Sequence, residues 1–206
     1  MTEKSISDIV IRRLPLYLRT LQYMEQENRY ITSSQELGER LGVSAAQIRK
    51  DLSQFGEFGK QGTGYNIKYL VEQIEAILQV DKVWKVAVIG AGDIGSALAN
   101  YSGFAHRGFE ISMVFDKDPE KIGTKVSDFE VFDIADLEDK ISDAGIKIAM
   151  IGVPAKFAQD VTNCLIEAGV KAILNYAPVN INVPPDILVQ HIDPSIHLQS
   201  MTYYLE

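Results

Sequence analysis

The sequence predicts an α/β fold made of two domains, and three observations support this prediction. Apolar residues recur with a helical period of about 3.6 through the first 80 residues. From Trp84 onward, short apolar runs alternate with helical stretches, a rhythm that is typical of a buried parallel sheet. The charge divides at a similar place, because residues 1–68 carry a net charge of +2 and residues 69–206 carry −10. Such an asymmetry indicates two parts with different partners.

The first predicted element is an amphipathic helix near the N-terminus. Its apolar face is expected to hold Ile6, Ile9, Val10, Leu14, Tyr17, Leu18, Leu21 and Met24. Pro15 lacks the backbone N–H that the interior of an α-helix requires, so we expect this helix to end or kink near Leu14.

The segment ITSSQELGERLGVSAAQIRKDLSQFG predicts two short helices separated by a tight turn. Ser33 and Glu36 have the spacing of a capping box for a helix that runs through Leu41. Gly42 favours a left-handed stop, and Ser44 caps the next helix two residues later. This pattern is the helix-turn-helix signature. An ordinary pair of surface helices is the alternative.

The second of these helices is the candidate for DNA recognition. Ile48, Leu52 and Phe55 share one face and are expected to pack on the preceding helix. On the opposite face, Arg and Gln can read base edges in the major groove while Lys and the cap residues hold phosphates. The glycine-rich FGEFGKQGTGYNI then predicts a wing, and KYLVEQIEAILQ a closing helix. The residues predicted to contact DNA are Ser44, Ala46, Gln47, Arg49, Lys50, Ser53 and Lys60.

The second domain opens with the apolar strand VAVI, and GAGDIG follows it directly. A G-x-G-x-x-G sequence gains meaning when a strand precedes it and a helix follows it, as the pattern indicates here. Gly90 is expected to make the turn, Gly92 to let a dinucleotide pyrophosphate approach the backbone, and Gly95 to allow close helix–strand packing. The helix N-terminus would add amide donors and a positive dipole end. The residues predicted to form this phosphate site are Gly90, Ala91, Gly92, Asp93, Ile94 and Gly95.

Asp116 ends the next strand, 21 residues after Gly95. A carboxylate at this position can accept hydrogen bonds from the adenosine ribose and would repel a 2′-phosphate, which favours NAD(H) over NADP(H). Lys117 beside it keeps NADP(H) open. The later runs IKIAMIGV and KAILNY complete a predicted doubly wound, Rossmann-type parallel sheet.

Little in the sequence indicates chemistry beyond nucleotide binding. The three histidines form no proton-transfer or metal-ligand motif, so no catalytic residue and no metal are predicted. The single cysteine, Cys164, is expected to be a small core residue on a helix. MTEKSISDIV lacks the apolar segment of an export signal, and no apolar run reaches the roughly 18 residues of a membrane span. We therefore expect a cytoplasmic protein without a membrane partner.

These stretches together resemble the Rex family of redox-sensing transcriptional repressors over nearly the whole chain. The resemblance rests on RRLPLYLRTL, SSQELGERLGVSAAQIRKDLSQFGEFGKQGTGY, GAGDIGSALANY, FDKDP, GVP and ILNYAPV. It implies a homodimer that binds palindromic operator DNA and releases it when NADH binds, so that the protein responds to the NADH/NAD+ ratio and is not an enzyme. With a boundary expected near residues 79–82, the predicted domains are a winged-helix domain (1–80), a Rossmann NAD(H)-binding domain (81–192) and a C-terminal helix (193–206) swapped within the dimer.

The resemblance also gives roles to individual residues of the cofactor and DNA sites. It implies that Val153 and Pro154 line the cofactor cleft and that Arg49 and Lys50 lie on the DNA.

By the same resemblance, Arg19, Tyr101 and Asp193 form a redox switch, with Asp193 coming from the partner subunit near the nicotinamide. Without the resemblance, the three residues are interpreted as a surface ion pair, a core aromatic and a helix cap. The C-terminal helix could equally pack on its own domain.

Two other functions stay open on the residues alone. One is a small NAD-dependent oxidoreductase with a helical dimerisation domain, which would turn over a carbonyl substrate. The other is a cofactor-binding interaction protein whose N-terminal domain binds protein rather than DNA.

Overall fold

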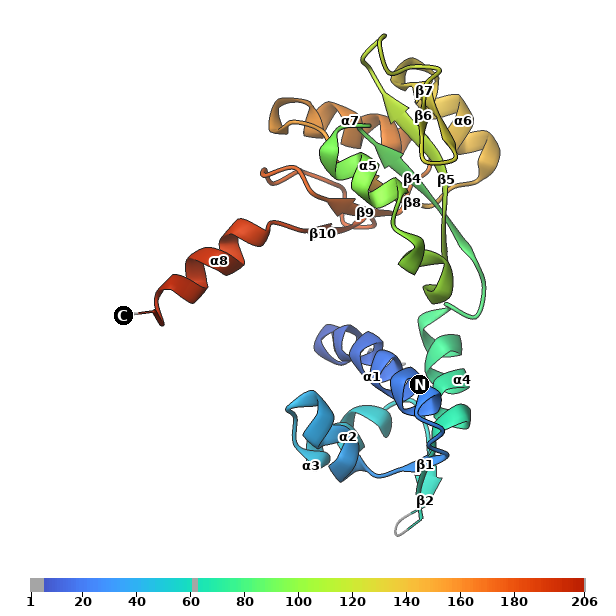
Figure 1. Cartoon of the computed structure of the whole chain (residues 1–206), viewed down its shortest axis with the longest axis vertical. Helices are drawn as coiled ribbons and strands as arrows, with labels where there is room; N and C mark the ends of the chain where they lie inside the picture. The colour runs from blue at the N-terminus through green and yellow to red at the C-terminus, as the bar shows by residue number, and fades with distance from the viewer. Residues whose placement is uncertain (1–5, 61–62, 206) are drawn as a thin grey trace. The chain divides into compact units, whose positions relative to one another are not determined.

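The structure is a computed structural model that describes residues 6–60 and 63–205, except the side chain of Lys60 (Figure 1). The chain divides into two compact units, Met1–Lys82 and Val83–Glu206. Each unit has its own hydrophobic core. The described part of the chain contains no helix with the length and hydrophobicity of a membrane span.

The first unit combines helices with a small antiparallel sheet, in which β3 pairs with both β1 and β2. Its described elements are α1 (Asp8–Gln26), β1 (Ile31–Thr32), α2 (Ser34–Leu41), α3 (Ala45–Leu52), β2 (Gly59–Lys60), β3 (Gly64–Asn66) and α4 (Ile67–Leu78). α2 and α3 form the helix-turn-helix, and β2 with β3 forms the wing. The predicted winged helix-turn-helix is therefore confirmed.

Local hydrogen bonds fix the ends of the two short helices as the sequence predicts. The Ser33 hydroxyl accepts from the Glu36 N–H and the Ser44 hydroxyl from the Gln47 N–H, both at 3.1 Å. Gly42 ends α2 with φ at 69°, in the left-handed region that glycine adopts without strain. The turn between α2 and α3 is thus set by residues within it.

The first helix departs from its prediction in two ways. α1 continues through Pro15 to its end at Gln26, so the helix does not end near Leu14. The alternative expectation, a kink near Leu14, stays a prediction. Burial of its apolar face outweighs the one hydrogen bond that proline removes. That face consists of Val10, Leu14, Tyr17, Leu18, Leu21 and Met24. Ile9, which was predicted to belong to it, is 65% exposed, because it lies a quarter turn away from Val10.

The second unit is built on a sheet with the strand order β10-β9-β8-β4-β5-β7-β6, parallel except for β6. Its described strands are β4 (Trp84–Ile89), β5 (Phe109–Asp116), β6 (Lys125–Val126), β7 (Phe129–Asp133), β8 (Ile148–Ile151), β9 (Ala172–Asn175) and β10 (Leu188–His191). The chain winds outward from β4 to β7, then crosses back to β8 and winds outward to β10. This is the Rossmann order, and its switch point lies between β4 and β8. The predicted doubly wound parallel sheet is confirmed.

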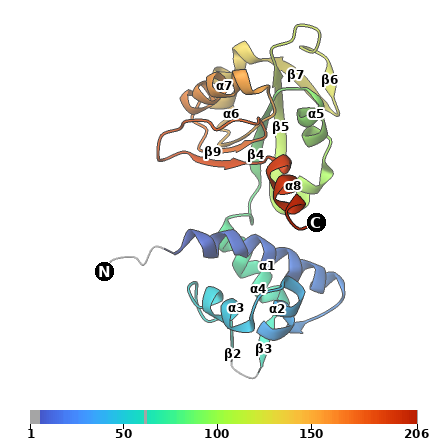
Figure 2. The same ribbon diagram turned by 90° about the vertical axis from the view of Figure 1, so that its left-hand side faces the viewer.

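Helices cover both faces of this sheet (Figure 2). The described helices are α5 (Asp93–Ala99), η1 (Ser102–Arg107), η2 (Ile134–Asp136), α6 (Leu137–Ala144), α7 (Ala155–Glu167) and α8 (Pro194–Thr202). Alternate residues of β4 serve the two faces: Val86 and Val88 belong to one core, and Ala87 and Ile89 to the other. Such burial on both sides explains why the strand reads as a continuous apolar run.

The last helix, α8, buries none of its residues in this chain. Its large apolar side chains, Ile196, Leu198 and Met201, are each at least 60% exposed. The alternative that this helix packs on its own domain is therefore wrong for the single chain.

Candidate functional site

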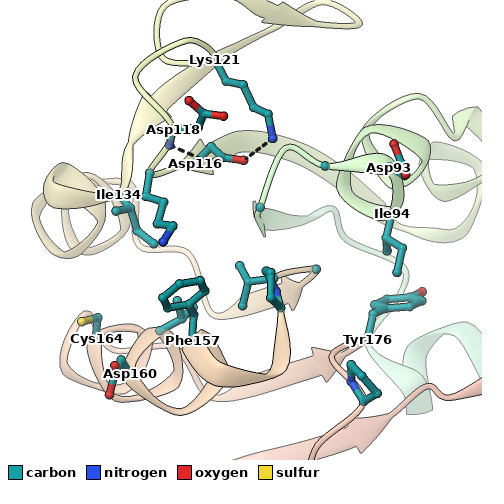
Figure 3. Close-up of a pocket in the computed structure, with 18 residues that line it drawn as sticks. Asp93, Ile94, Asp116, Asp118, Lys121, Ile134, Phe157, Asp160, Cys164 and Tyr176 are labelled. Atoms are coloured by element: carbon teal, nitrogen blue, oxygen red, sulfur yellow. Dashed lines mark hydrogen bonds and ion pairs between the residues drawn. The ribbon is translucent and has the colours of Figure 1, made fainter.

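A cavity of about 690 Å³ opens at the switch point of the sheet, where the carboxyl ends of β4, β5 and β8 meet (Figure 3). Ligands of open α/β sheets bind at this position. Seven of the nine residues predicted to bind the cofactor line it: Gly90, Gly92, Asp93, Ile94, Asp116, Val153 and Pro154. The other two, Ala91 and Gly95, are buried behind its wall.

The three glycines of the loop meet different surroundings. Gly90 has φ at +99°, and a Cβ there would lie 2.8 Å from the carbonyl oxygen of Gly152. A Cβ on Gly95 would overlap the carbonyl oxygen of Gly90. A Cβ on Gly92 would meet nothing within 4 Å. The first and third glycines are thus required by the packing of the chain itself, whereas the space beside the second is left for a ligand.

The start of α5 faces this cavity without a protein cap. Gly92 is the N-cap residue and supplies no side-chain acceptor for the first N–H groups of the helix. Uncapped amides at a helix N-terminus favour an anion such as a phosphate. Together with the open space at Gly92, this arrangement fits the pyrophosphate of a dinucleotide.

Asp116 is buried at the end of β5, and its carboxylate is already engaged within the chain. Its Oδ2 accepts from the Ala91 N–H at 2.7 Å and from the Lys121 ammonium at 3.3 Å. Its Oδ1 accepts from the Asp118 N–H at 2.9 Å. Burial raises the pKa of Asp116, but these bonds outweigh it and hold the pKa below its usual value. The carboxylate therefore ties the glycine loop to the turn after β5, while its predicted contact with the ribose stays a prediction.

Asp118 and Lys121 also line the cavity, and sequence reasoning assigned them no role. Both belong to the segment FDKDPEK. The carboxyl end of β5 is where a charged side chain can meet the adenosine part of a dinucleotide. Their position directly after the predicted strand is the feature of the sequence that could have identified them.

The opposite wall of the cavity comes from α7. The Lys117 ammonium lies 3.4 Å from the centroid of the Phe157 ring. This cation–π contact gives the lysine a partner within the protein. Cys164 lies on α7 as expected, but it is exposed and lines the cavity, so the prediction of a core residue is wrong. α7 buries Ala158, Val161, Thr162 and Leu165 instead, and Cys164 falls beside that stripe.

Some of the residues predicted to contact DNA have exposed side chains, and others form hydrogen bonds within the first unit. Ala46, Lys50 and Ser53 are exposed. Arg49 is also exposed, and its Nη1 donates to the Ser34 hydroxyl at 2.9 Å. The helix ends at Leu52, earlier than its pattern suggests. The backbone of Lys60 belongs to the wing strand β2, but its side chain lies outside the described part.

Two other predicted DNA contacts have partners within the first unit. The Gln47 amide donates to the Asp51 carboxylate at 2.7 Å, and the Ser44 hydroxyl is used as the cap of α3. Asp51 itself is completely buried, and sequence reasoning gave it no role. The available signal was its spacing, because it lies three residues after Ile48 on the apolar face of the helix.

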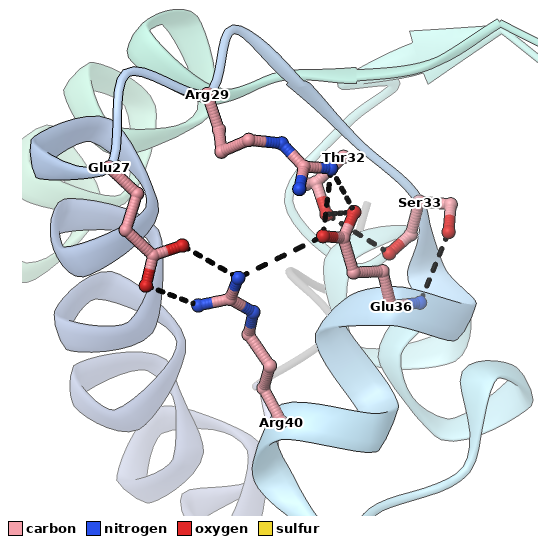
Figure 4. A network of polar contacts seen from close by, with 6 residues as sticks. All are labelled: Glu27, Arg29, Thr32, Ser33, Glu36 and Arg40. Carbon is pink, nitrogen blue, oxygen red and sulfur yellow. Dashed lines mark hydrogen bonds and ion pairs between the residues drawn. The ribbon is translucent and has the colours of Figure 1, made fainter.

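A second polar network joins the end of α1 to α2 at the surface (Figure 4). Arg40 donates to both carboxylate oxygens of Glu27, at 3.0 and 2.7 Å. Glu36 accepts from Arg29 and from the Thr32 hydroxyl, both at 3.1 Å. Exposed ion pairs contribute about 0–1 kcal/mol each, and a two-pronged arginine–carboxylate pair within a network lies at the upper end of that range.

Of the three residues of the expected redox switch, Arg19 lies in the first unit, and Tyr101 and Asp193 lie in the second. Arg19 is exposed on α1 of the first unit and makes no ion pair with a described residue. Tyr101 of the second unit is 49% exposed, so it is not a core aromatic. Asp193 caps α8, because its Oδ1 accepts from the N–H and the hydroxyl of Ser195 at 2.9 and 2.6 Å.

The described residues contain no group of three or more His, Cys, Asp or Glu side chains that could hold a metal ion. The cavity is lined by the glycine loop, the buried carboxylate of Asp116 and the aromatic rings of Phe157 and Tyr176. Groups of this kind suit the binding of a dinucleotide.

Comparisons with known proteins agree with both halves of this arrangement. Residues 5–53 match the family described as "Putative DNA-binding protein N-terminus", and residues 81–179 match the family described as "CoA binding domain". The redox-sensing transcriptional repressor Rex of Chloroflexus aurantiacus is 54% identical over 96% of this chain and 93% of its own length. The Rex protein of Brevibacillus brevis is 45% identical over 98% of both chains.

Solved structures give the same result. RSP in complex with beta-NAD+ and operator DNA has a TM-score of 0.93 and 40% identity, covering 97% of this chain and 92% of RSP. RSP in complex with beta-NADH has a TM-score of 0.89 and 38% identity, covering 98% of this chain and 95% of RSP. With relatives this similar over nearly its full length, the chain belongs to the Rex family of redox-sensing transcriptional repressors.

Proposed function

We propose that this protein is a dimeric repressor that binds palindromic operator DNA and releases it when NADH binds. The observation that carries the proposal is the similarity of the whole chain to RSP, which was crystallised with beta-NAD+ and operator DNA and also with beta-NADH. A repressor of this kind works in the cytoplasm of a bacterial cell, where its operators lie.

The dinucleotide acts as a ligand that is not turned over. In support, relatives that match nearly the whole chain are named as transcriptional repressors, and the cavity combines a glycine loop, uncapped amides and apolar walls that suit a bound dinucleotide. The residues that would hold the cofactor are Gly90, Ala91, Gly92, Asp93, Ile94, Gly95, Asp116, Val153 and Pro154. Asp116 acts mainly by ordering the glycine loop.

On the DNA side, the exposed face of α3 enters the major groove. Arg49 and Lys50 contribute most of the affinity, since their cations are exposed and can reach phosphates and base edges. Ala46 allows close approach, and Ser53 lies on the same face. Gln47 contributes mainly through Asp51, and Lys60 of the wing completes the contact.

The homodimer forms through α8, whose exposed apolar side chains need a partner surface. Arg19, Tyr101 and the partner's Asp193 form the switch that reports the oxidation state of the nicotinamide. An oxidised nicotinamide carries a positive charge that competes with arginine for the carboxylate. For release, NADH must bind the DNA-free state more tightly than the DNA-bound state, because equal affinity shifts nothing.

Fluorescence anisotropy of a labelled palindromic duplex tests the proposal. Protein is titrated into the duplex at fixed salt, and NADH or NAD+ is then added to the complex. We expect release by NADH at concentrations at which NAD+ leaves the complex intact. The double substitution Arg49→Ala with Lys50→Ala should abolish operator binding and keep NADH affinity.

The matched control is the double substitution Lys85→Ala with Lys125→Ala in the second unit. Both side chains are exposed, so this variant also loses two positive charges, but outside the DNA-binding unit. If the protein binds the palindromic duplex no better than scrambled DNA in the presence of either cofactor, the proposal is wrong. Consumption of NADH with carbonyl substrates would then support the alternative function, a small NAD-dependent oxidoreductase.

A further inference from the structure

The buried carboxylate of Asp51 joins two helices of the DNA-binding unit. Arg13 of α1 donates to it from Nε at 2.6 Å and from Nη2 at 2.8 Å. The Tyr17 hydroxyl, one helical turn further along α1, donates at 2.6 Å. The Gln47 amide, one turn earlier on α3, donates at 2.7 Å. Four hydrogen bonds therefore converge on two oxygens that no solvent reaches.

The geometry of these bonds resists movement of α3 relative to α1. A two-pronged arginine–carboxylate pair fixes direction as well as distance, because both N–H groups must stay in the plane of the carboxylate. The tyrosine hydroxyl adds a third point from the same helix. Rotation of α3 about its axis would break all three bonds at once, whereas the apolar contacts of Ile48 and Leu52 tolerate small rotations.

A buried charge at this position is poorly explained by stability alone. The desolvation of such a pair offsets most of its attraction, and apolar side chains of similar volume often serve stability as well or better. Burial raises the pKa of Asp51, yet its three donors hold that pKa below its usual value. Burial first, and the Asp51 hydrogen bond second, raise the pKa of Tyr17 to about 12. The charges therefore stay fixed at physiological pH.

We propose that Asp51, with Arg13 and Tyr17, is a positioning residue for operator recognition, holding α3 so that Arg49 and Lys50 present a fixed face to the bases. Asp51 directly follows both cations in the chain and touches no DNA itself. The inference rests on the proposed function. It assigns part of the specificity for the operator sequence to the buried contact between α1 and α3 that Arg13, Tyr17 and Asp51 form.

Weakening the hydrogen bonds between α1 and α3 should lower the affinity for operator DNA more than the affinity for non-specific DNA. Contacts to base edges require the correct direction of each side chain, whereas phosphates attract a mobile cation almost as well as a fixed one. Partial unfolding differs, because it lowers the affinity for every duplex by the same factor. The ratio of operator affinity to scrambled-duplex affinity therefore distinguishes a positioning role from a merely structural one.

The test compares Tyr17→Phe and Asp51→Asn with wild type in the full chain. Tyr23→Phe is the matched control, since Tyr23 lies on the same helix with its side chain 54% exposed. We expect the operator preference to fall about threefold in Tyr17→Phe and about tenfold or more in Asp51→Asn, as bonds to a charged group are lost. Tyr23→Phe should equal wild type, and all variants should keep NADH affinity.

Thermal unfolding shows whether each variant is folded at the assay temperature. If Asp51→Asn does not fold, Tyr17→Phe decides alone, because it keeps the ion pair. An unchanged operator preference in the folded variants overturns the inference. If wild type itself shows no operator preference, the proposed function fails first, and the inference fails with it.

Discussion

Substituting Gly92 by alanine should leave the fold intact and weaken cofactor binding. The backbone at Gly92 has φ at −83° and ψ at −165°, an extended conformation that alanine adopts freely. The added Cβ meets no atom of the chain within 4 Å. The new methyl group enters the space beside the loop that the dinucleotide pyrophosphate is proposed to occupy.

We expect the Gly92→Ala substitution to raise the stability of the fold and to lower the affinity for NADH. Replacing glycine at an unstrained position stabilises a protein by about 0.4–1 kcal/mol, because the unfolded chain loses conformational freedom. A methyl group that holds the pyrophosphate away from the loop loses at least one charge-assisted hydrogen bond, about 1.5–3 kcal/mol. That loss corresponds to roughly a ten- to hundredfold weaker Kd for NADH.

Two measurements on the same preparation check this prediction: thermal unfolding without ligand, and calorimetric titration with NADH. Gly95→Ala is the contrasting variant, since its Cβ would overlap the Gly90 carbonyl oxygen and lie 2.9 Å from the carbonyl carbon. It should lower the unfolding temperature as well as NADH affinity. Wild-type NADH affinity in Gly92→Ala would refute close approach of the pyrophosphate to the loop.

Three further predictions concern the remaining parts of the chain. Because the pKa of Tyr17 is raised from 10.0 to about 12, its contribution to stability is complete below pH 10 and is lost as pH rises through 12. Alkaline unfolding followed by circular dichroism should show this loss in wild type, and a similar loss in Tyr17→Phe would contradict it. Combined substitution of Ile196 and Leu198 by aspartate should dissociate the dimer in analytical ultracentrifugation without destabilising the monomer, in which both side chains are exposed; a persisting dimer would exclude α8 from the interface. Gly38→Ala should cost about 1–3 kcal/mol in urea unfolding, since its Cβ would lie 2.5 Å from the Val43 carbonyl oxygen, and an unchanged midpoint would refute this.

Local chemistry made much of this protein predictable. Ser33, Ser44 and Gly42 act on backbone groups within three or four residues, so the helix-turn-helix could be recognised from spacing alone. The glycine loop is equally local, because its strand, turn and helix are contiguous. Amphipathic period and charge asymmetry then separated a helical half from a sheet half.

Only the tertiary structure decided what depends on distant partners. The course of α1 through Pro15 follows from an apolar face buried against the rest of the first unit, which propensity does not contain. The engagement of Asp116 by Ala91 and the convergence of Arg13 and Tyr17 on Asp51 each join residues more than 20 positions apart. Local rules extend over one turn of helix or one pair of strand residues, whereas the partner of a buried charge is chosen by the packing of the whole unit. The sequence by itself therefore determined which elements form and which ligand class they suit, and the fold determined which charges are free to act on a ligand.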